Sequence, residues 1–153
     1  MRIQIMGIKG DAGFSDIVRH FEQLGGDAVI LDADMVCGRD HLLSAVMHAE
    51  RAFENGTNRS KTILTETILY AAGDRQIGRA TEAMRPKKNA GGAVAVLFGI
   101  EEPMLEAICM ARCDSLIEAS PEKAKNIGAE MFAGVSCEDA VLEHVAAVDL
   151  LKQ

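Results

Sequence analysis

The stretch from His41 to Ala80 constrains the fold most, because its apolar residues repeat with the spacing of three successive short helices. In the first helix an apolar residue recurs every three or four positions, which places one set on a single face: Leu42, Val46, Ala49 and Phe53. Asn55-Gly56 ends this helix and Gly73 ends the second, because these residues tolerate the left-handed conformation that a helix C-terminus often needs. Asp74 then offers a carboxylate that can cap a third helix.

Apolar segments outside this stretch predict the strands of a mixed α and β fold. Arg2–Ile8 alternates, Val29–Leu31 is short and apolar, and Ala93–Gly99 is apolar throughout, as in a central strand covered on both faces. Leu116–Ile117 and Met131–Val135 are weaker strand candidates. The order of elements suggests one compact domain with few strands and many helices. Connections of these lengths allow either parallel or antiparallel pairing, and the pattern does not decide between them.

Three helices are predicted after the apolar strand, and Ser120-Pro121-Glu122 starts the small middle one, with Ser as its cap and Pro at its first position. Glu101-Glu102-Pro103 fits a helix start, with acids and a proline in the first turn. The last helix begins near Ser136 and Asp139 and runs to about Lys152, with apolar residues around much of its circumference. Two interpretations are open for such a helix. It packs on the core and also contacts another surface, or it packs on the core alone.

The composition is that of a folded protein without a membrane segment. Its 153 residues suit a single domain over 1–153, and 48% of them are hydrophobic, which excludes a disordered chain. No apolar run approaches the length of a membrane span, and the apolar part of the first residues is too short for a signal peptide, so we expect a cytoplasmic protein. The cysteines lack zinc-ligand spacing and are expected to be small buried residues in a reducing compartment: Cys37, Cys109, Cys113 and Cys137.

The charge is distributed unevenly along the chain. The net charge is −7, but seven bases and three acids give the segment from Asn58 to Lys88 a charge of +4, which leaves −11 on the remainder. This asymmetry indicates either one basic face on an acidic body or a set of solvated helix faces.

Arg75 is a cation at a position where helices usually disfavour one. It would lie in the first turn of the third helix, where the partial positive charge of the helix N-terminus disfavours a cation. Broken local rules often mark functional sites, and an arginine beside free backbone N–H groups is a candidate seat for an anion such as a phosphate. The alternative is that Arg75 points into water or pairs with Glu66 or Asp74.

The residue types favour a binding module over an enzyme. No nucleophile–base pair, metal-ligand cluster or cofactor motif is present, and Asp32 and Asp34 fit a turn or a helix cap. Aromatic residues are too scarce for a platform that stacks successive bases, so nucleic acid would be bound mainly through phosphates. Two other hypotheses stay open. One is a small enzyme for an anionic metabolite, with Arg75 and Arg79 as a clamp and Asp32 or Glu66 as the acid–base group; the other is a purely structural subunit.

The central stretch resembles the TPRKB family, the kinase-binding subunit of the KEOPS complex. The resemblance rests on His41-Leu42-Leu43, Ala45 and His48-Ala49, then on Glu66, Leu69-Tyr70, Gly73, Arg75-Gln76-Ile77 and Ala80, and finally on Val145-Ala146 with Asp149-Leu150. The length suits the compact archaeal members of that family.

The resemblance implies a non-catalytic regulatory role without a cofactor or metal. Members bind the small atypical kinase-ATPase of a complex that makes threonylcarbamoyl-adenosine in tRNA, and they bind the single-stranded 3′ CCA end of tRNA. The implied fold is α+β, a small, mainly antiparallel central sheet wrapped by helices. Whether the isolated chain forms a homodimer through its apolar face is left open.

The resemblance also assigns the site residues. The RNA face would carry the phosphate contacts Arg59, Lys61, Arg75, Arg79, Lys87 and Lys88, with Glu66, Tyr70, Gln76 and Ile77 shaping a notch for the terminal nucleotides. The kinase face would lie on the last helix, through Val145, Val148 and Leu151.

Overall fold

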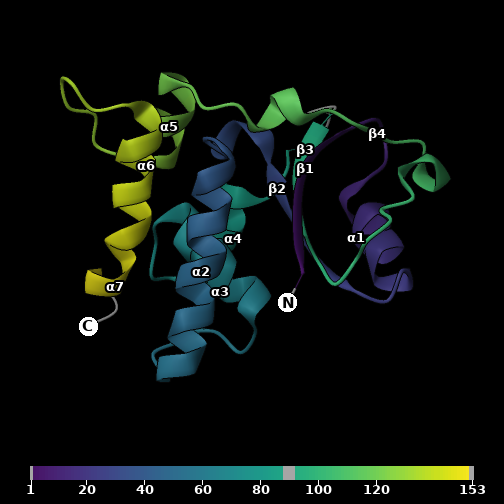
Figure 1. The fold of residues 1–153 in the computed structure, drawn as a ribbon, viewed down its shortest axis with the longest axis horizontal. Coiled ribbons are helices and arrows are strands. Elements are labelled where there is room, and N and C mark those ends of the chain that lie inside the picture. The colour runs from purple at the N-terminus through teal and green to yellow at the C-terminus, as the bar shows by residue number, and fades with distance from the viewer. Residues whose placement is uncertain (1, 88–91, 152–153) are drawn as a thin grey trace. The chain divides into compact units, whose positions relative to one another are not determined.

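The computed structural model describes residues 2–87 and 92–151, and the chain forms two compact units (Figure 1). The sheet unit comprises Met1–Ala33 and Arg85–Ile117. The helical unit comprises Asp34–Met84 and Glu118–Gln153. Of the sequence-predicted site residues, Lys88 lies outside the described residues. None of the described helices is long and apolar enough to cross a membrane.

The sheet unit is built on four antiparallel strands. These are β1 (Ile3–Lys9), β2 (Asp27–Asp32), β3 (Gly92–Phe98) and β4 (Ala111–Arg112), in the order β2-β3-β1-β4. All of Ala93–Phe98 is buried, so the predicted central strand is confirmed. The α+β class and the antiparallel pairing implied by the family resemblance are confirmed as well.

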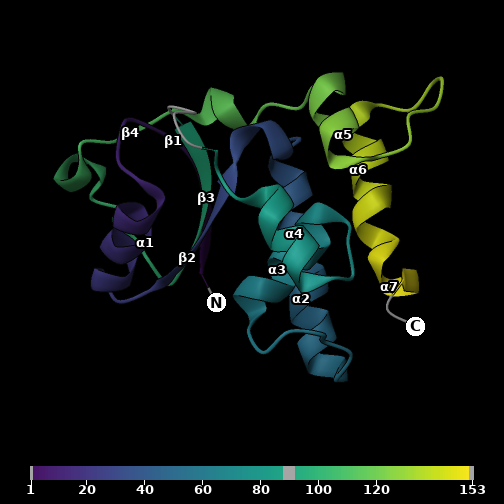
Figure 2. The ribbon, with the colours of Figure 1, turned by 180° about the vertical axis from the view of Figure 1, so that it is seen from behind.

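Helix α1 (Phe14–Gln23) covers one face of the sheet, as both ribbon views show (Figures 1 and 2). Ile17 and Phe21 lie one turn apart on its buried side, and a fully buried Phe contributes about 1.5–3 kcal/mol. They pack against every second residue of the neighbouring strands, with the cluster comprising Met6, Ile8, Ile30, Ala93, Ala95 and Leu97. Successive side chains of a strand point to opposite faces of the sheet, so these alternate residues of β1 and β3 all lie on the face that α1 covers.

Three elements predicted after β3 are wrong. The helix expected from Glu101 is only a 3₁₀ turn, Leu105–Ile108, because Met104 and Cys109 on either side have positive φ and end it. Ala111 and Arg112 leave that turn to pair with the otherwise open edge of β1. Leu116–Ile117 belongs to a second 3₁₀ turn, Asp114–Ile117, and Met131–Val135 is a loop in the helical unit.

The helical unit begins with the three predicted helices. They are α2 (Arg39–Asn55), α3 (Ile63–Ala72) and α4 (Ile77–Met84), and α4 packs back on α3 (Figure 2). Gly56 and Gly73 end α2 and α3 with φ of 69° and 70°. Asp74 accepts a bond from the Gln76 N–H, but the cap of α4 is Gln76, whose Oε1 accepts from the Arg79 N–H at 2.6 Å.

The C-terminal part of this unit contains α5 (Pro121–Ile127), α6 (Cys137–Ala146) and α7 (Val148–Leu151). Ser120 and Ser136 cap α5 and α6, with their hydroxyls accepting from N–H groups three residues later. The last helix was predicted as continuous, but it breaks at Ala147 into α6 and α7.

Substituting the two helix-ending glycines separates backbone strain from steric clash. We expect Gly56→Ala to cost roughly 1–2 kcal/mol, because its φ is left-handed while the added Cβ meets nothing within 4 Å. Gly73→Ala has the same φ, but its Cβ would lie 2.1 Å from the His144 ring, so roughly 1–3 kcal/mol more is expected. Urea unfolding of both variants measures the difference. Equal losses would show that His144 moves aside without cost.

Candidate partner and nucleic-acid interface

Glu66 anchors the loop before α3 and is completely buried. Its Oε1 accepts from the N–H of Arg59 (3.0 Å), the N–H of Ser60 (2.9 Å) and the Ser60 hydroxyl (2.8 Å). The carboxylate is thus engaged by the loop and has no open surface. Glu66 can therefore shape a notch for nucleotides only by holding this loop from beneath, and that role stays a prediction.

Tyr70 lies in a polar cluster that joins three helices. Its ring is buried, and its hydroxyl donates to Oδ1 of Asp149 on α7. His48 on α2 stacks on the Tyr70 ring at a centroid distance of 5.1 Å and donates from Nδ1 to Asp149 Oδ2 at 3.3 Å. Burial, followed by the bond to Asp149, raises the pKa of Tyr70 above its ordinary value. Tyr70 therefore fixes α7 against α2 and α3, and its predicted part in shaping an RNA notch would be indirect, through these helices.

Arg75 contacts the C-terminal helix. Its Nη1 donates to the carbonyl oxygen of Leu151 at 3.1 Å, whereas the sequence suggested water, Glu66 or Asp74. Asp74 instead pairs with Arg79, whose Nε and Nη2 each lie 2.9 Å from a carboxylate oxygen. This pairing holds the pKa of Asp74 below its ordinary value. The turn after α3 is therefore a charged, solvent-exposed corner.

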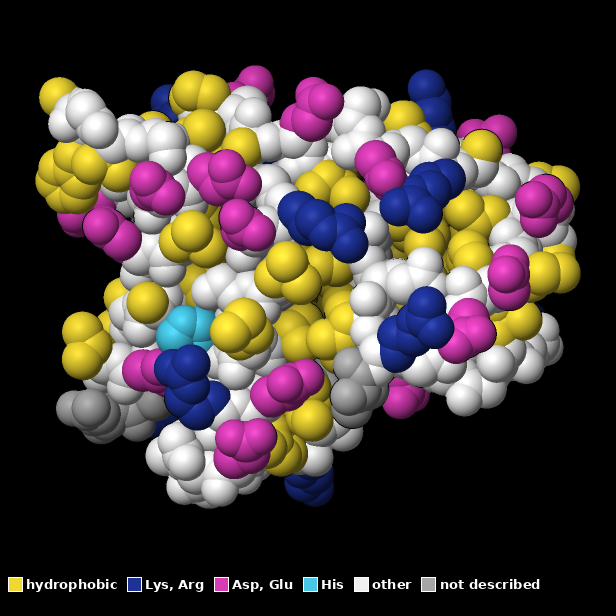
Figure 3. All heavy atoms as spheres, viewed as in Figure 1, with side chains coloured by type: hydrophobic (Ala, Val, Ile, Leu, Met, Phe, Trp, Pro, Cys, Tyr) yellow, Lys and Arg dark blue, Asp and Glu magenta, His cyan; other side chains and the backbone are white. Residues whose placement is uncertain are grey.

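The predicted RNA-binding residues do not converge on one point. In the helical unit, Arg59 and Lys61 precede α3, while Arg75, Gln76, Ile77 and Arg79 follow it, and all six are exposed. The ten residues of α3 separate the two groups by about 15 Å. On the face drawn in Figure 3, basic side chains lie beside acidic ones.

Lys87 belongs to the sheet unit. Its Nζ lies 3.1 Å from Oδ2 of Asp32, a carboxylate that is only 2% exposed. Asp32 therefore has a structural partner at the end of β2, and the +4 segment is divided between the two units.

The residues predicted for the kinase face differ in exposure. Val145 and Val148 are completely buried and anchor α6 and α7, so neither can contact a partner in this conformation. Leu151 is 45% exposed, so its side chain is accessible and its contact with a kinase stays a prediction. Leu150 is 70% exposed, and the sequence reasoning left it out of the site although it ends the Val145–Leu150 motif. The exposed apolar residues of α7 are therefore Leu150 and Leu151.

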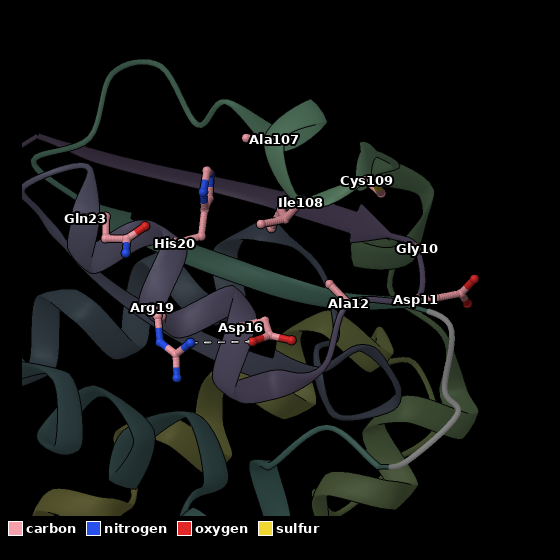
Figure 4. A pocket seen from close by; sticks show the side chains of 10 residues that line it. All are labelled: Gly10, Asp11, Ala12, Asp16, Arg19, His20, Gln23, Ala107, Ile108 and Cys109. Carbon is pink, nitrogen blue, oxygen red and sulfur yellow. Dashed lines mark ion pairs between the residues drawn. The ribbon is translucent and has the colours of Figure 1, made fainter.

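A pocket of about 640 Å³ lies in the sheet unit (Figure 4). It is lined by Gly10, Asp11, Ala12, Asp16, Arg19, His20, Gln23, Ala107, Ile108 and Cys109. Oδ1 of Asp16 and Nη1 of Arg19 lie 4.0 Å apart. Nε2 of His20 is hydrogen-bonded to the carbonyl oxygen of Pro103 at 2.7 Å. None of the residues named for the enzyme hypothesis lines this pocket: Asp32, Glu66, Arg75 and Arg79 all lie elsewhere.

The family model described as "Kinase binding protein CGI-121" matches residues 15–146. The chain belongs to the CGI-121 family. This is the kinase-binding family that the resemblance indicated, and its description names a binding role. No curated protein matches the chain.

The CGI-121 match extends from the start of α1 to the end of α6. It includes all of the segment from Asn58 to Lys88 and the polar residues His48 and Tyr70. It ends before α7, so Asp149, Leu150 and Leu151 lie beyond it. The family match therefore gives no support to a role for these three residues.

Proposed function

We propose that this CGI-121 protein is a non-catalytic regulatory subunit of a KEOPS-type tRNA modification complex. It forms one functional domain over residues 1–153, acts in the cytoplasm and binds the small atypical kinase-ATPase of that complex. The observation that carries the proposal is the family match over residues 15–146, together with the exposed apolar end of α7. The enzyme hypothesis has less support, because Glu66 is engaged by its loop and Arg79 by Asp74.

The kinase contact is proposed for Leu150 and Leu151. Interface energy usually concentrates in a few apolar or aromatic anchors that become desolvated. The buried side chains of Val145 and Val148 anchor α6 and α7 in the core. The hydrogen bond from Arg75 to the Leu151 carbonyl oxygen fixes the end of α7. Without the kinase, the same apolar end is the surface through which two copies would pair.

Charges on α7 test this contact. The double variant Leu150→Glu/Leu151→Glu is expected to weaken binding to the kinase-ATPase about 30-fold or more, because two apolar anchors become charged. Met131→Glu is the matched control, since Met131 is 44% exposed in the loop before α6. Co-purification measures the effect, with circular dichroism to confirm folding. Retention of the pair in the double variant would move the contact to another helix. Val148→Asp is unsuitable, because a charge there enters the core.

The second proposed partner is the single-stranded 3′ CCA end of tRNA. Its phosphates would contact the exposed bases Arg59, Lys61, Arg75 and Arg79 of the helical unit, with Lys87 and Lys88 as further contacts. Gln76 and Ile77 are exposed on the corner beside Arg75 and are proposed to meet the terminal bases. The buried side chains of Glu66 and Tyr70 stabilise the loop before α3 and the packing of α3, and so support the proposed RNA face indirectly.

Reversing the charge of Arg75 tests the RNA face. Arg75→Glu is expected to lower tRNA affinity and to reduce the slope of log affinity against log salt by about 1, because one phosphate contact is lost. Lys125→Glu, at an exposed base on α5, controls for net charge. Binding to tRNA with and without its CCA end measures both effects. An unchanged affinity and slope for Arg75→Glu would remove this residue from the RNA face.

A further inference from the structure

Two cysteines distant in the sequence pack in the same cluster of the helical unit. Cys37 precedes α2 and is completely buried, whereas Cys137 is the first residue of α6 and is half-buried. Both are free cysteines. Cys137 packs against the buried cluster that contains Cys37, together with Ala124, Ile127, Ala129, Ala140 and Val141. Positions 37 and 137 thus meet across 100 residues of chain.

The contact extends beyond the two cysteines. Cys37 Sγ donates to the Ser120 carbonyl at 3.6 Å, and the nearby Cys137 contributes to the raised pKa of the Cys37 thiol. The next residues meet too, since a Cβ on Gly38 would lie 2.2 Å from Glu138 Oε1. The segment before α2 and the start of α6 are therefore in contact at two successive positions.

The environments of the two thiols differ in a way that suits stepwise oxidation. Burial raises the pKa of the Cys37 thiol, so Cys37 stays protonated and is shielded from solvent. Cys137 is the accessible member, because its side chain is half-buried at the start of α6. Within this pair, an oxidant in solution therefore reaches Cys137 before Cys37, and Cys37 lies in the cluster against which Cys137 packs.

We propose that Cys37 and Cys137 form a redox-sensitive pair that a hydroperoxide converts into an intramolecular disulfide between the start of α2 and the start of α6. The Cys137 thiolate attacks one peroxide oxygen, the O–O bond breaks, and the sulfenic acid forms with release of one water or alcohol. The Cys37 sulfur then attacks the Cys137 sulfur, and the S–S bond forms as the S–O bond breaks. The departing hydroxide takes the Cys37 proton and leaves as water. Two thiols are oxidised and one peroxide is reduced.

The other two cysteines provide internal controls. Contrary to the expectation of four buried cysteines, Cys109 is exposed and Cys113 half-buried, both in the sheet unit. The Cys113 thiol contacts the Ser115 hydroxyl at 3.3 Å, and among the described residues neither Cys109 nor Cys113 is hydrogen-bonded to another thiol. Their replacement should leave the proposed pair intact.

Treatment of the full chain with dilute hydrogen peroxide tests the proposal. The Cys109→Ser/Cys113→Ser variant is expected to lose the mass of two hydrogen atoms, to yield a linked Cys37–Cys137 peptide on digestion, and to gain roughly 5–10 °C in Tm that a dithiol reverses. Adding Cys137→Ser should abolish all three changes while the unoxidised Tm stays close to that of the parent. Oxidation of Cys137 to a sulfinic acid without a linked peptide would overturn the proposal.

Discussion

Glu66→Ala is expected to lower the free energy of unfolding by about 3–5 kcal/mol, a large share of the roughly 5–15 kcal/mol typical of a folded protein. The substitution leaves the N–H groups of Arg59 and Ser60 without this acceptor, while the Ser60 hydroxyl keeps the Thr62 carbonyl at 3.0 Å. Each unsatisfied buried donor costs about 1–3 kcal/mol, and the vacated space adds to the loss. Glu66→Gln keeps one acceptor oxygen and should lose less.

The adjacent residue provides a matched control for Glu66. Thr67 is equally buried, but its Oγ1 has no hydrogen-bond partner among the described residues. Thr67→Val removes that unsatisfied hydroxyl while keeping the shape, so it should be neutral or stabilising. Urea unfolding of the three variants measures these effects. A Glu66→Ala variant as stable as Thr67→Val would show that the loop does not depend on the carboxylate.

Acid is expected to destabilise the fold through His41. This residue is completely buried between α2 and α3, where Nδ1 accepts from the Cys37 N–H at 3.1 Å and Nε2–H donates to the Ala71 carbonyl at 2.8 Å. Only the neutral imidazole can make both bonds. Burial lowers the pKa of His41 to about 4, whereas an unfolded histidine has a pKa of about 6.5.

Between these two pKa values the unfolded chain binds a proton at His41 and the folded chain does not. The stability from neutral His41 is therefore complete above about pH 6.5 and is lost as the pH falls toward 4, by up to roughly 3 kcal/mol. Urea unfolding of the natural chain and of His41→Gln at several pH values measures this loss. His20, His48 and His144 are present in both chains, so the difference in slope belongs to position 41. Identical slopes would show that His41 does not require its neutral form.

The parts of the fold that depend on local sequence were predictable. The apolar period of α2, the glycines that end α2 and α3, and the continuous apolar run of β3 each specify their element within a few residues. The pairing of β1 with β4 was not predictable, because it depends on how Met104 and Cys109 turn the chain after β3. The antiparallel direction came from the family resemblance, since the connection lengths allowed both directions.

The candidate site shows where local reasoning fails. Glu66, Tyr70, Val145 and Val148 belong to the residues that the sequence singled out, but all four are buried. Tyr70 meets Asp149 only through tertiary packing, and no local pattern reveals such a partner. Charge counting likewise placed Lys87 with Arg75, although the two lie in different units. Leu150 could have been found, because it is an apolar residue within the C-terminal motif.

Calorimetric titration of the purified chain with the purified small kinase-ATPase of a KEOPS complex tests the central claim most directly. The account predicts a saturable complex of one copy of each at micromolar concentrations, and a large loss of affinity for Leu150→Glu/Leu151→Glu but not for Met131→Glu. A chain that stays folded yet shows no heat of binding and no co-elution with the kinase would contradict it.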